Sequence, residues 1–183
     1  MVLPIILARA AAAQPATGPP NDPFADGAWM LSLSVSALTE AWNYNDNREE
    51  LYEIESGLQY AVREGLAVGV TGLTAYISQR GVDAYAMGWL GGPRWALYRR
   101  AGGAVSVNLD VGMVRAELPT PPRGTRFNYL FRIGASVSWP VSRSVNALVS
   151  VGWLHLSNNS LNGPGHNPDI QTIGVTAGVL MPF

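Results

Sequence analysis

The sequence predicts an all-β fold, an eight-stranded antiparallel transmembrane β-barrel. Three observations lead to this fold class: apolar and polar residues alternate in eight successive segments, the polar faces consist of small residues, and the connections alternate in length. Charged residues make up only 14% of the 183 residues, well below the roughly 25% typical of soluble domains. Composition by itself leaves a soluble β-sandwich open, so the barrel depends on the pattern of each segment.

Eight segments show the two-residue period of a β-strand. We expect these strands at about residues 27–40, 51–62, 66–78, 82–98, 104–118, 126–139, 145–158 and 170–183. The sixth is the clearest, because Phe127 and Tyr129 share one face while Asn128 and Arg132 share the other. In the fourth segment, residues 91–93 (Gly-Gly-Pro) predict a bulge or a bend, since Gly and Pro inside a strand usually mark one.

The two faces of these strands predict which side meets lipid. The polar faces carry Ser, Gly, Asn and Thr with single charges such as Asp110 and Arg132, which suits the interior of a small barrel. A soluble lipocalin-like barrel would show the reverse arrangement. We expect an aromatic girdle at the two interfaces from Trp29, Trp89, Tyr129, Trp139 and Trp153.

The connections favour the same fold. Those after the second, fourth and sixth segments are short, those after the first, fifth and seventh are longer and polar, and the one after the third is modest. This asymmetry is typical of barrels in the bacterial outer membrane, and the final Phe183 resembles the aromatic C-terminus of such proteins. We therefore predict a multi-pass protein of the bacterial cell outer membrane.

The first 26 residues differ in composition from the rest. Residues 1–13 are short and apolar, and Ala11 to Ala13 fit a small-residue cleavage site, so we interpret them as a signal-peptide remnant. A positive n-region is missing and Arg9 interrupts the apolar part, so an Ala-rich disordered leader is the alternative. Residues 14–26 are Pro-rich and are expected to be extended or disordered, with the barrel following over residues 27–183.

Composition also argues against several functions. A net charge of −1 gives no sign of a nucleic-acid partner, and the lack of cysteine removes disulfides and thiolate chemistry. With two histidines, of which His166 is expected on a loop surface, no convincing metal-ligand cluster is present. We expect no cofactor. The sequence leaves a homodimer open.

The seventh segment has an apolar face that ends in two polar residues. The face that begins at Val145 and continues to Trp153 finishes with His155 and Ser157. A strand tilted by about 40–45° climbs roughly 2.4 Å per residue along the membrane normal, so it crosses a 25 Å apolar band in about ten residues. His155 and Ser157 are thus expected on the outer wall at the height of lipid esters, where a His can take a proton from a Ser hydroxyl. The alternative is a polar pair that simply ends a strand at the interface.

The motif around this pair is His155-Leu156-Ser157-Asn158, followed by Asn167-Pro168-Asp169-Ile170-Gln171. Over about residues 153–174 the sequence resembles the outer-membrane lipid A 3-O-deacylases, the PagL-type acyloxyacyl hydrolases, which are eight-stranded barrels. The resemblance implies that Ser157 is the nucleophile and His155 the base, that Asn158 helps form the oxyanion hole, and that the substrate is lipid A of lipopolysaccharide.

The sequence departs from the family pattern at the acid. Where the family has Glu, this chain has Gln171, while Asp169 lies two residues earlier with the same parity. Either Asp169 serves as the acid or the triad lacks its carboxylate. Asn159 and Ser160 also stand where the family tends to have small residues and a Gly, which affects the second oxyanion donor.

Three functions follow from these residues. The first is a serine esterase that removes an acyl chain from lipid A in the outer leaflet; the resemblance implies the 3-O-linked chain. The second is a catalytically impaired lipid-binding or structural barrel of the same family, which the Gln171 substitution favours. The third is a soluble β-barrel that binds a ligand, which predicts extraction into buffer without detergent.

Overall fold

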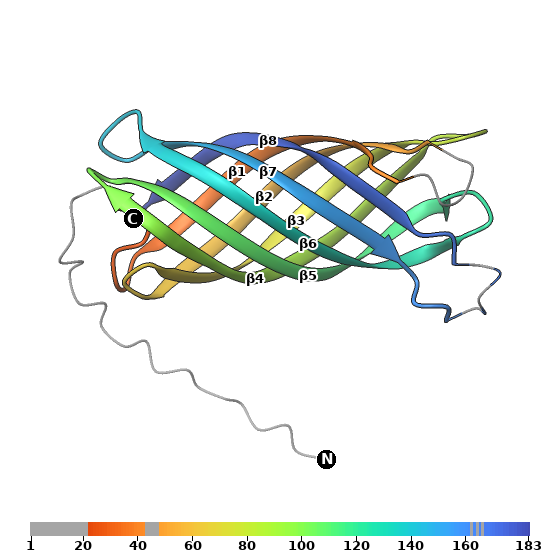
Figure 1. The fold of residues 1–183 in the computed structure, drawn as a ribbon, viewed down its shortest axis with the longest axis horizontal. Helices are drawn as coiled ribbons and strands as arrows, with labels where there is room; N and C mark the ends of the chain where they lie inside the picture. The colour runs from red at the N-terminus through yellow and green to blue at the C-terminus, as the bar shows by residue number, and fades with distance from the viewer. Residues whose placement is uncertain (1–21, 43–47, 162, 164, 166) are drawn as a thin grey trace, which may run out of the picture.

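The computed structural model describes residues 22–42, 48–161, 163, 165 and 167–183. Within these residues, eight strands form a closed antiparallel barrel in which each strand pairs with its neighbours in sequence and β8 closes on β1 (Figure 1). The strands are β1 Trp29–Glu40, β2 Glu50–Arg63, β3 Leu66–Ser78, β4 Ala84–Arg100, β5 Gly103–Thr120, β6 Thr125–Pro140, β7 Asn146–Ser157 and β8 Ile170–Pro182. The predicted fold class is confirmed. Among the residues described, none forms an apolar helix of membrane-spanning length.

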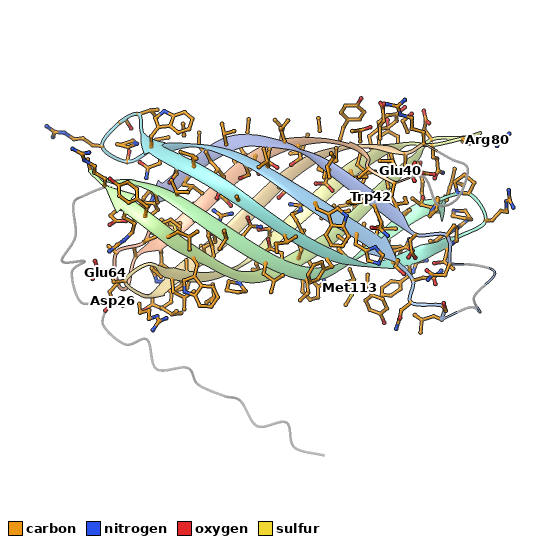
Figure 2. All side chains as sticks on the ribbon, in the orientation of Figure 1. Asp26, Glu40, Trp42, Glu64, Arg80 and Met113 are labelled. Carbon is orange, nitrogen blue, oxygen red and sulfur yellow. The ribbon has the colours of Figure 1, made fainter. Side chains whose placement is uncertain are left out.

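The barrel has two unlike ends. At the short-turn end, residues 64–65, 101–102 and 141–145 connect the strands; at the long-loop end, residues 41–49, 79–83, 121–124 and 158–169 do so. Figure 2 shows Asp26 and Glu64 at the first end, and Glu40, Trp42 and Arg80 at the second. The connection after β5 is shorter than expected, because β5 and β6 extend their pairing to Thr120 and Thr125.

The outer wall is apolar, as the alternation predicts. Val151 and Val175 are 57% and 56% exposed, whereas Leu148 and Leu154 on the opposite face of the wall are buried. The side chains expected as an aromatic girdle also lie on this wall; Trp29, Trp89, Tyr129 and Trp139 are exposed and Trp153 is half-buried. A barrel with an apolar exterior is suited to lipid rather than to water.

The interior is layered, with apolar side chains at inward positions in addition to the small polar residues that the sequence predicts there. An apolar cluster that includes Leu38, Ile77, Leu154, Leu156 and Ile170 fills the long-loop half. A smaller cluster around Met30 fills the short-turn end. Because these inward positions are shielded from both lipid and water, they can hold apolar side chains as a soluble core does.

Charged residues occupy the middle of the lumen. Arg132 on β6 forms ion pairs with Glu53 at 2.6 Å and with Glu55 at 2.9 Å, both on β2, which lies four strands away around the barrel. Ser36 Oγ donates a hydrogen bond to Glu55 Oε1 (2.9 Å). The remaining space at this level is a cavity of about 60 Å³, lined in part by Arg94 and Asp110. Buried charges of both signs therefore neutralise one another inside the barrel.

Residues 22–28 close the short-turn end. Phe24 is 1% exposed and packs with Met30, Ala67 and Ala104, and the Gly65 backbone N–H donates to Phe24 O (3.0 Å). Arg99 forms an ion pair with Asp22 at 2.9 Å and a second with Glu64. Residues 22–26 thus make turns that pack on the barrel, where the sequence predicts an extended or disordered stretch, because Phe24 finds an apolar mouth to fill.

The irregularity predicted at residues 91–93 takes the form of a gap in the β4–β5 ladder. β4 pairs with β3 without a break through these residues. In the β4–β5 ladder, Gly91 and Arg94 are paired in one register with no pair between them, and that register shifts between Ala96 and Tyr98. A Cβ on Gly92 would lie 1.9 Å from Leu109 O, so glycine here permits close approach of the adjacent backbone.

Candidate functional site

His155 and Ser157 lie on the outward face of β7 at its C-terminal end, which is at the long-loop end of the barrel. Their cross-strand partners on β6 are Phe131 and Tyr129, respectively. The His155 ring stacks on Trp153 with centroids 5.8 Å apart and planes 22° apart, and Trp153 contacts Phe131 edge-on. The imidazole is therefore half-buried in an aromatic surround on the wall that faces lipid.

The Ser157 hydroxyl is held by the loop that follows it. Ser157 is 9% exposed, and its Oγ donates to Asn167 Oδ1 (3.0 Å) while accepting from the Asn159 backbone N–H (3.1 Å). The Asn158 backbone N–H donates to the same Asn167 Oδ1 (2.9 Å). Among the described residues no hydrogen bond joins Ser157 to His155, and the buried His155 Nδ1 has no hydrogen-bond partner. Catalysis would require the hydroxyl to turn from Asn167 towards the imidazole.

Asn167 was part of the motif, but sequence reasoning assigned it no role. Its hydrogen bond with Ser157, ten residues earlier in the chain, holds the start of the second motif segment against the end of β7. The only signal for it in the sequence is that it begins the second segment of the motif. The residues around a loop asparagine do not show which group its side chain will bond.

Two positions are candidates for the third member of the triad, Gln171 and Asp169. Gln171 lies directly opposite His155 in the β7–β8 ladder. The ladder ends at the next pair, Leu156 with Ile170, so Asp169 precedes the last paired residue of β8. Asp169 is half-buried at this edge. The register therefore brings an uncharged amide, rather than a carboxylate, across from the imidazole.

Asn158 is turned away from the outer wall. Its side chain is buried, with Nδ2 donating to Thr125 Oγ1 (3.0 Å) at the start of β6. Both its backbone N–H and its side-chain amide are engaged, so donation to an oxyanion would require one of these bonds to open. The Asn159 N–H already points at Ser157 Oγ, which makes it a second backbone donor near the reacting atom.

A shallow apolar groove lies on the outer wall next to the cross-strand partners of Trp153, on the membrane-centre side of the candidate site. Its apolar lining comes from Ile133, Val151, Ile173 and Val175, and Ile133 and Ile173 are the cross-strand partners of Trp153. Gly134, Gly152 and Gly174 face one another across β6, β7 and β8 and form its floor. A groove of this chemistry can accommodate a hydrocarbon chain beside His155.

The remaining histidine, His166, lies outside the described residues. No group of three or more His, Asp or Glu suited to a metal ion occurs in the part of the chain that the structure describes.

Comparison with known proteins shows which proteins have a similar fold. No protein-family model and no curated protein matches the chain. Neisserial surface protein A matches with a TM-score of 0.65 at 12% identity, over 86% of this chain and all of that one. The outer membrane enzyme PagL matches with a TM-score of 0.56 at 15% identity, over 84% of this chain and 99% of that one.

A third similar structure is the outer membrane protein OprG from Pseudomonas aeruginosa, with a TM-score of 0.52 at 9% identity over 86% of this chain and 96% of that one. At these identities the likeness concerns the fold alone. The chain has the eight-stranded barrel fold of outer-membrane proteins, and with its apolar wall this supports an outer-membrane location. One of the three neighbours is an enzyme by its description, so the fold does not assign an activity.

Proposed function

We propose that the protein is a serine esterase that hydrolyses an acyl ester of lipid A in the outer leaflet of the outer membrane. The observation that carries this proposal is the placement of His155 and Ser157 on the outward wall at the long-loop end of β7, beside an apolar groove. Membrane-soluble substrates reach this wall without leaving the lipid. The motif resemblance to lipid A 3-O-deacylases supports the 3-O-linked chain as the ester cleaved.

The chemistry follows from the residue types. His155 takes the proton of the Ser157 hydroxyl as Oγ attacks the ester carbonyl, and the resulting oxyanion needs N–H donors such as that of Asn159. His155 then protonates the departing sugar alcohol. Water hydrolyses the acyl-enzyme, which releases the fatty acid and restores Ser157. The net reaction consumes one water and yields one carboxylic acid and one alcohol.

A second candidate, a catalytically impaired lipid-binding or structural barrel, is favoured by two observations. Gln171 lies opposite His155, and the Ser157 hydroxyl is bonded to Asn167 rather than to the imidazole. An amide can orient an imidazole, but it cannot stabilise imidazolium as a carboxylate does. Hydrogen bonds of catalytic groups are often poorly aligned before substrate binds, so this geometry does not argue against the esterase. The esterase is supported by the placement of the pair on the wall and by the motif resemblance.

Mass spectrometry of lipid A from bacteria that express the protein tests the proposal. Wild-type protein is expected to produce a lipid A species that has lost one acyl chain, and Ser157→Ala and His155→Ala are expected to abolish it. Ser144→Ala, at an exposed serine in the turn before β7, is the matched control and should retain the product. Unchanged lipid A with a wild-type barrel that is folded, shown by its heat-dependent gel mobility, would favour the second candidate.

A further inference from the structure

The long-loop end of the β5–β6 hairpin carries three exposed arginines: Arg115 on β5, Arg123 in the connection and Arg126 on β6. We call them the arginine cluster. Among the residues that the structure describes, none of the three lies within ion-pair distance of a carboxylate. The hairpin's one acidic residue at this end, Glu117, accepts a hydrogen bond from the Tyr85 backbone N–H on β4 (3.2 Å). The cluster therefore carries three positive charges against the single carboxylate of Glu117, with which none of the three arginines forms an ion pair.

The register brings Arg115 near the candidate nucleophile. Met113 pairs with Tyr129, and Tyr129 pairs with Ser157, so Arg115 is two strands across from Ser157 and two residues further along its own strand. Strand spacing and rise then separate the two backbones by about 12 Å. Arg115 also belongs to the outward face of β5, as Ser157 does to that of β7. A long arginine side chain can lay its stem on this apolar wall and hold its guanidinium at the polar interface.

Hydrogen bonds hold the end of the hairpin that carries the cluster, and one of them connects it to the candidate site. Asn128 Nδ2 donates to both Thr120 O (3.1 Å) and Thr125 O (3.2 Å), and the Gly124 N–H donates to Pro121 O (2.8 Å). Thr125 in turn accepts from Asn158, the neighbour of Ser157. A rigid backbone reduces the ordering cost of binding, so the arginines are well placed to hold a ligand at a constant offset from Ser157.

The other described parts of the long-loop end are acidic or neutral. The β1–β2 end carries Glu40, Glu49 and Glu50 against Arg48, and the β3–β4 connection carries Arg80 and Asp83 (Glu40 and Arg80 are labelled in Figure 2). An anionic group at this end is consequently attracted to the β5–β6 hairpin and repelled from the β1–β2 side.

We propose that the arginine cluster is a phosphate-binding subsite for the head group of the lipid whose acyl ester reaches Ser157. This inference rests on the proposed esterase function. Guanidinium groups match phosphate oxygens with paired charge-assisted hydrogen bonds, and they do so best at a partly desolvated interface. The subsite makes a phosphorylated lipid the substrate class, with the phosphate over β5–β6 and the acyl chain in the groove over β6–β8.

Binding measurements on an inactive protein test the subsite apart from catalysis. The Ser157→Ala protein in detergent micelles is titrated calorimetrically with bisphosphorylated lipid A, with enzymatically dephosphorylated lipid A and with phosphatidylglycerol. A triple variant, Arg115→Gln, Arg123→Gln and Arg126→Gln, is compared with a control triple that removes the same charge from exposed arginines elsewhere, Arg63→Gln, Arg80→Gln and Arg143→Gln. Both triples are first shown to have the heat-dependent gel mobility of the folded barrel.

The cluster triple is expected to weaken binding of a phosphorylated lipid at least tenfold, and to leave binding of dephosphorylated lipid A within twofold. The control triple should change neither. A loss confined to lipid A assigns the phosphate to a glycolipid, and a loss confined to phosphatidylglycerol assigns it to a glycerophospholipid. Equal losses for phosphorylated and dephosphorylated lipid, or no loss, would overturn the inference. If the subsite is supported and the wild-type protein nonetheless leaves lipid A intact, the esterase proposal fails while the binding site stands.

Discussion

Gln171 on β8 is the direct cross-strand partner of His155 on β7. Residues so paired have Cβ atoms about 4.5–5.5 Å apart, which is within reach of a side-chain hydrogen bond. The position from which a glutamate carboxylate could support the imidazole is therefore occupied by Gln171, the uncharged isostere of glutamate. Several consequences of this pairing, and of the fold that creates it, can be measured.

Gln171→Glu is expected to raise the rate of ester hydrolysis at least tenfold. A carboxylate at this position would stabilise the imidazolium that forms as His155 accepts the Ser157 proton. The measurement is the initial rate of fatty-acid release from lipid A micelles, with Gln171→Ala as the control that should show no gain. An unchanged or lower rate in Gln171→Glu would mean that the carboxylate is supplied from elsewhere.

Asp169→Asn is expected to lower that rate less than His155→Ala does. Asp169 lies beyond the last pair of the β7–β8 ladder, so its alignment with the imidazole is weaker than that of residue 171. The same assay compares the two variants side by side. A loss equal to that of His155→Ala would instead assign the role of the acid to Asp169.

Asn167→Ala is expected to reduce the free energy of unfolding by about 2 kcal/mol, because Ser157 Oγ and the Asn158 N–H both lose their acceptor. Asn167→Asp retains a side-chain oxygen at this position and should recover most of the loss. Urea unfolding of the barrel in lipid vesicles, followed by tryptophan fluorescence, measures both. Equal stability of Asn167→Ala and wild type would show that the loop is held by other contacts.

Arg132→Met is expected to cost about 3–5 kcal/mol of unfolding free energy, because it leaves Glu53 and Glu55 buried without their cation. Adding Glu53→Gln and Glu55→Gln should restore much of that stability, since the repulsion between the two carboxylates is then gone. Arg143→Met, at an exposed turn, is the control and should change stability by less than about 0.5 kcal/mol. Failure of the added glutamines to rescue would argue that packing of the Arg132 side chain, rather than its charge, matters.

Gly174→Ala is expected to destabilise the barrel by about 1–3 kcal/mol, because the new Cβ would lie 2.3 Å from Ala37 O and 2.6 Å from Leu38 Cα. Gly72→Ala is a matched control on β3, where the nearest atom to a Cβ is Ser56 O at 3.9 Å. Thermal unfolding of the two variants should separate them clearly. Similar melting temperatures would show that β8 can move away from β1 at little cost.

Much of the candidate site could be predicted because it depends on parity. His155, Ser157 and Gln171 are outward residues of their strands, and alternation alone establishes which residues share a face. The bonds that Asn167 makes to Ser157 and Asn158 could not be predicted in this way, because they depend on how the loop between β7 and β8 returns to the barrel.

The sequence by itself determined the eight strands, their boundaries to within two residues and the apolar exterior, because a strand's side-chain period is local and repeats along the chain. The tertiary structure decided what closure brings together: the register of His155 with Gln171, the ion pairs of Arg132 with β2 across the lumen, and the packing of Phe24 into the barrel mouth. The physical reason is that alternation specifies the face on which a residue lies. Which distant residue it meets there depends on the stagger between strands and on the space left inside the closed barrel.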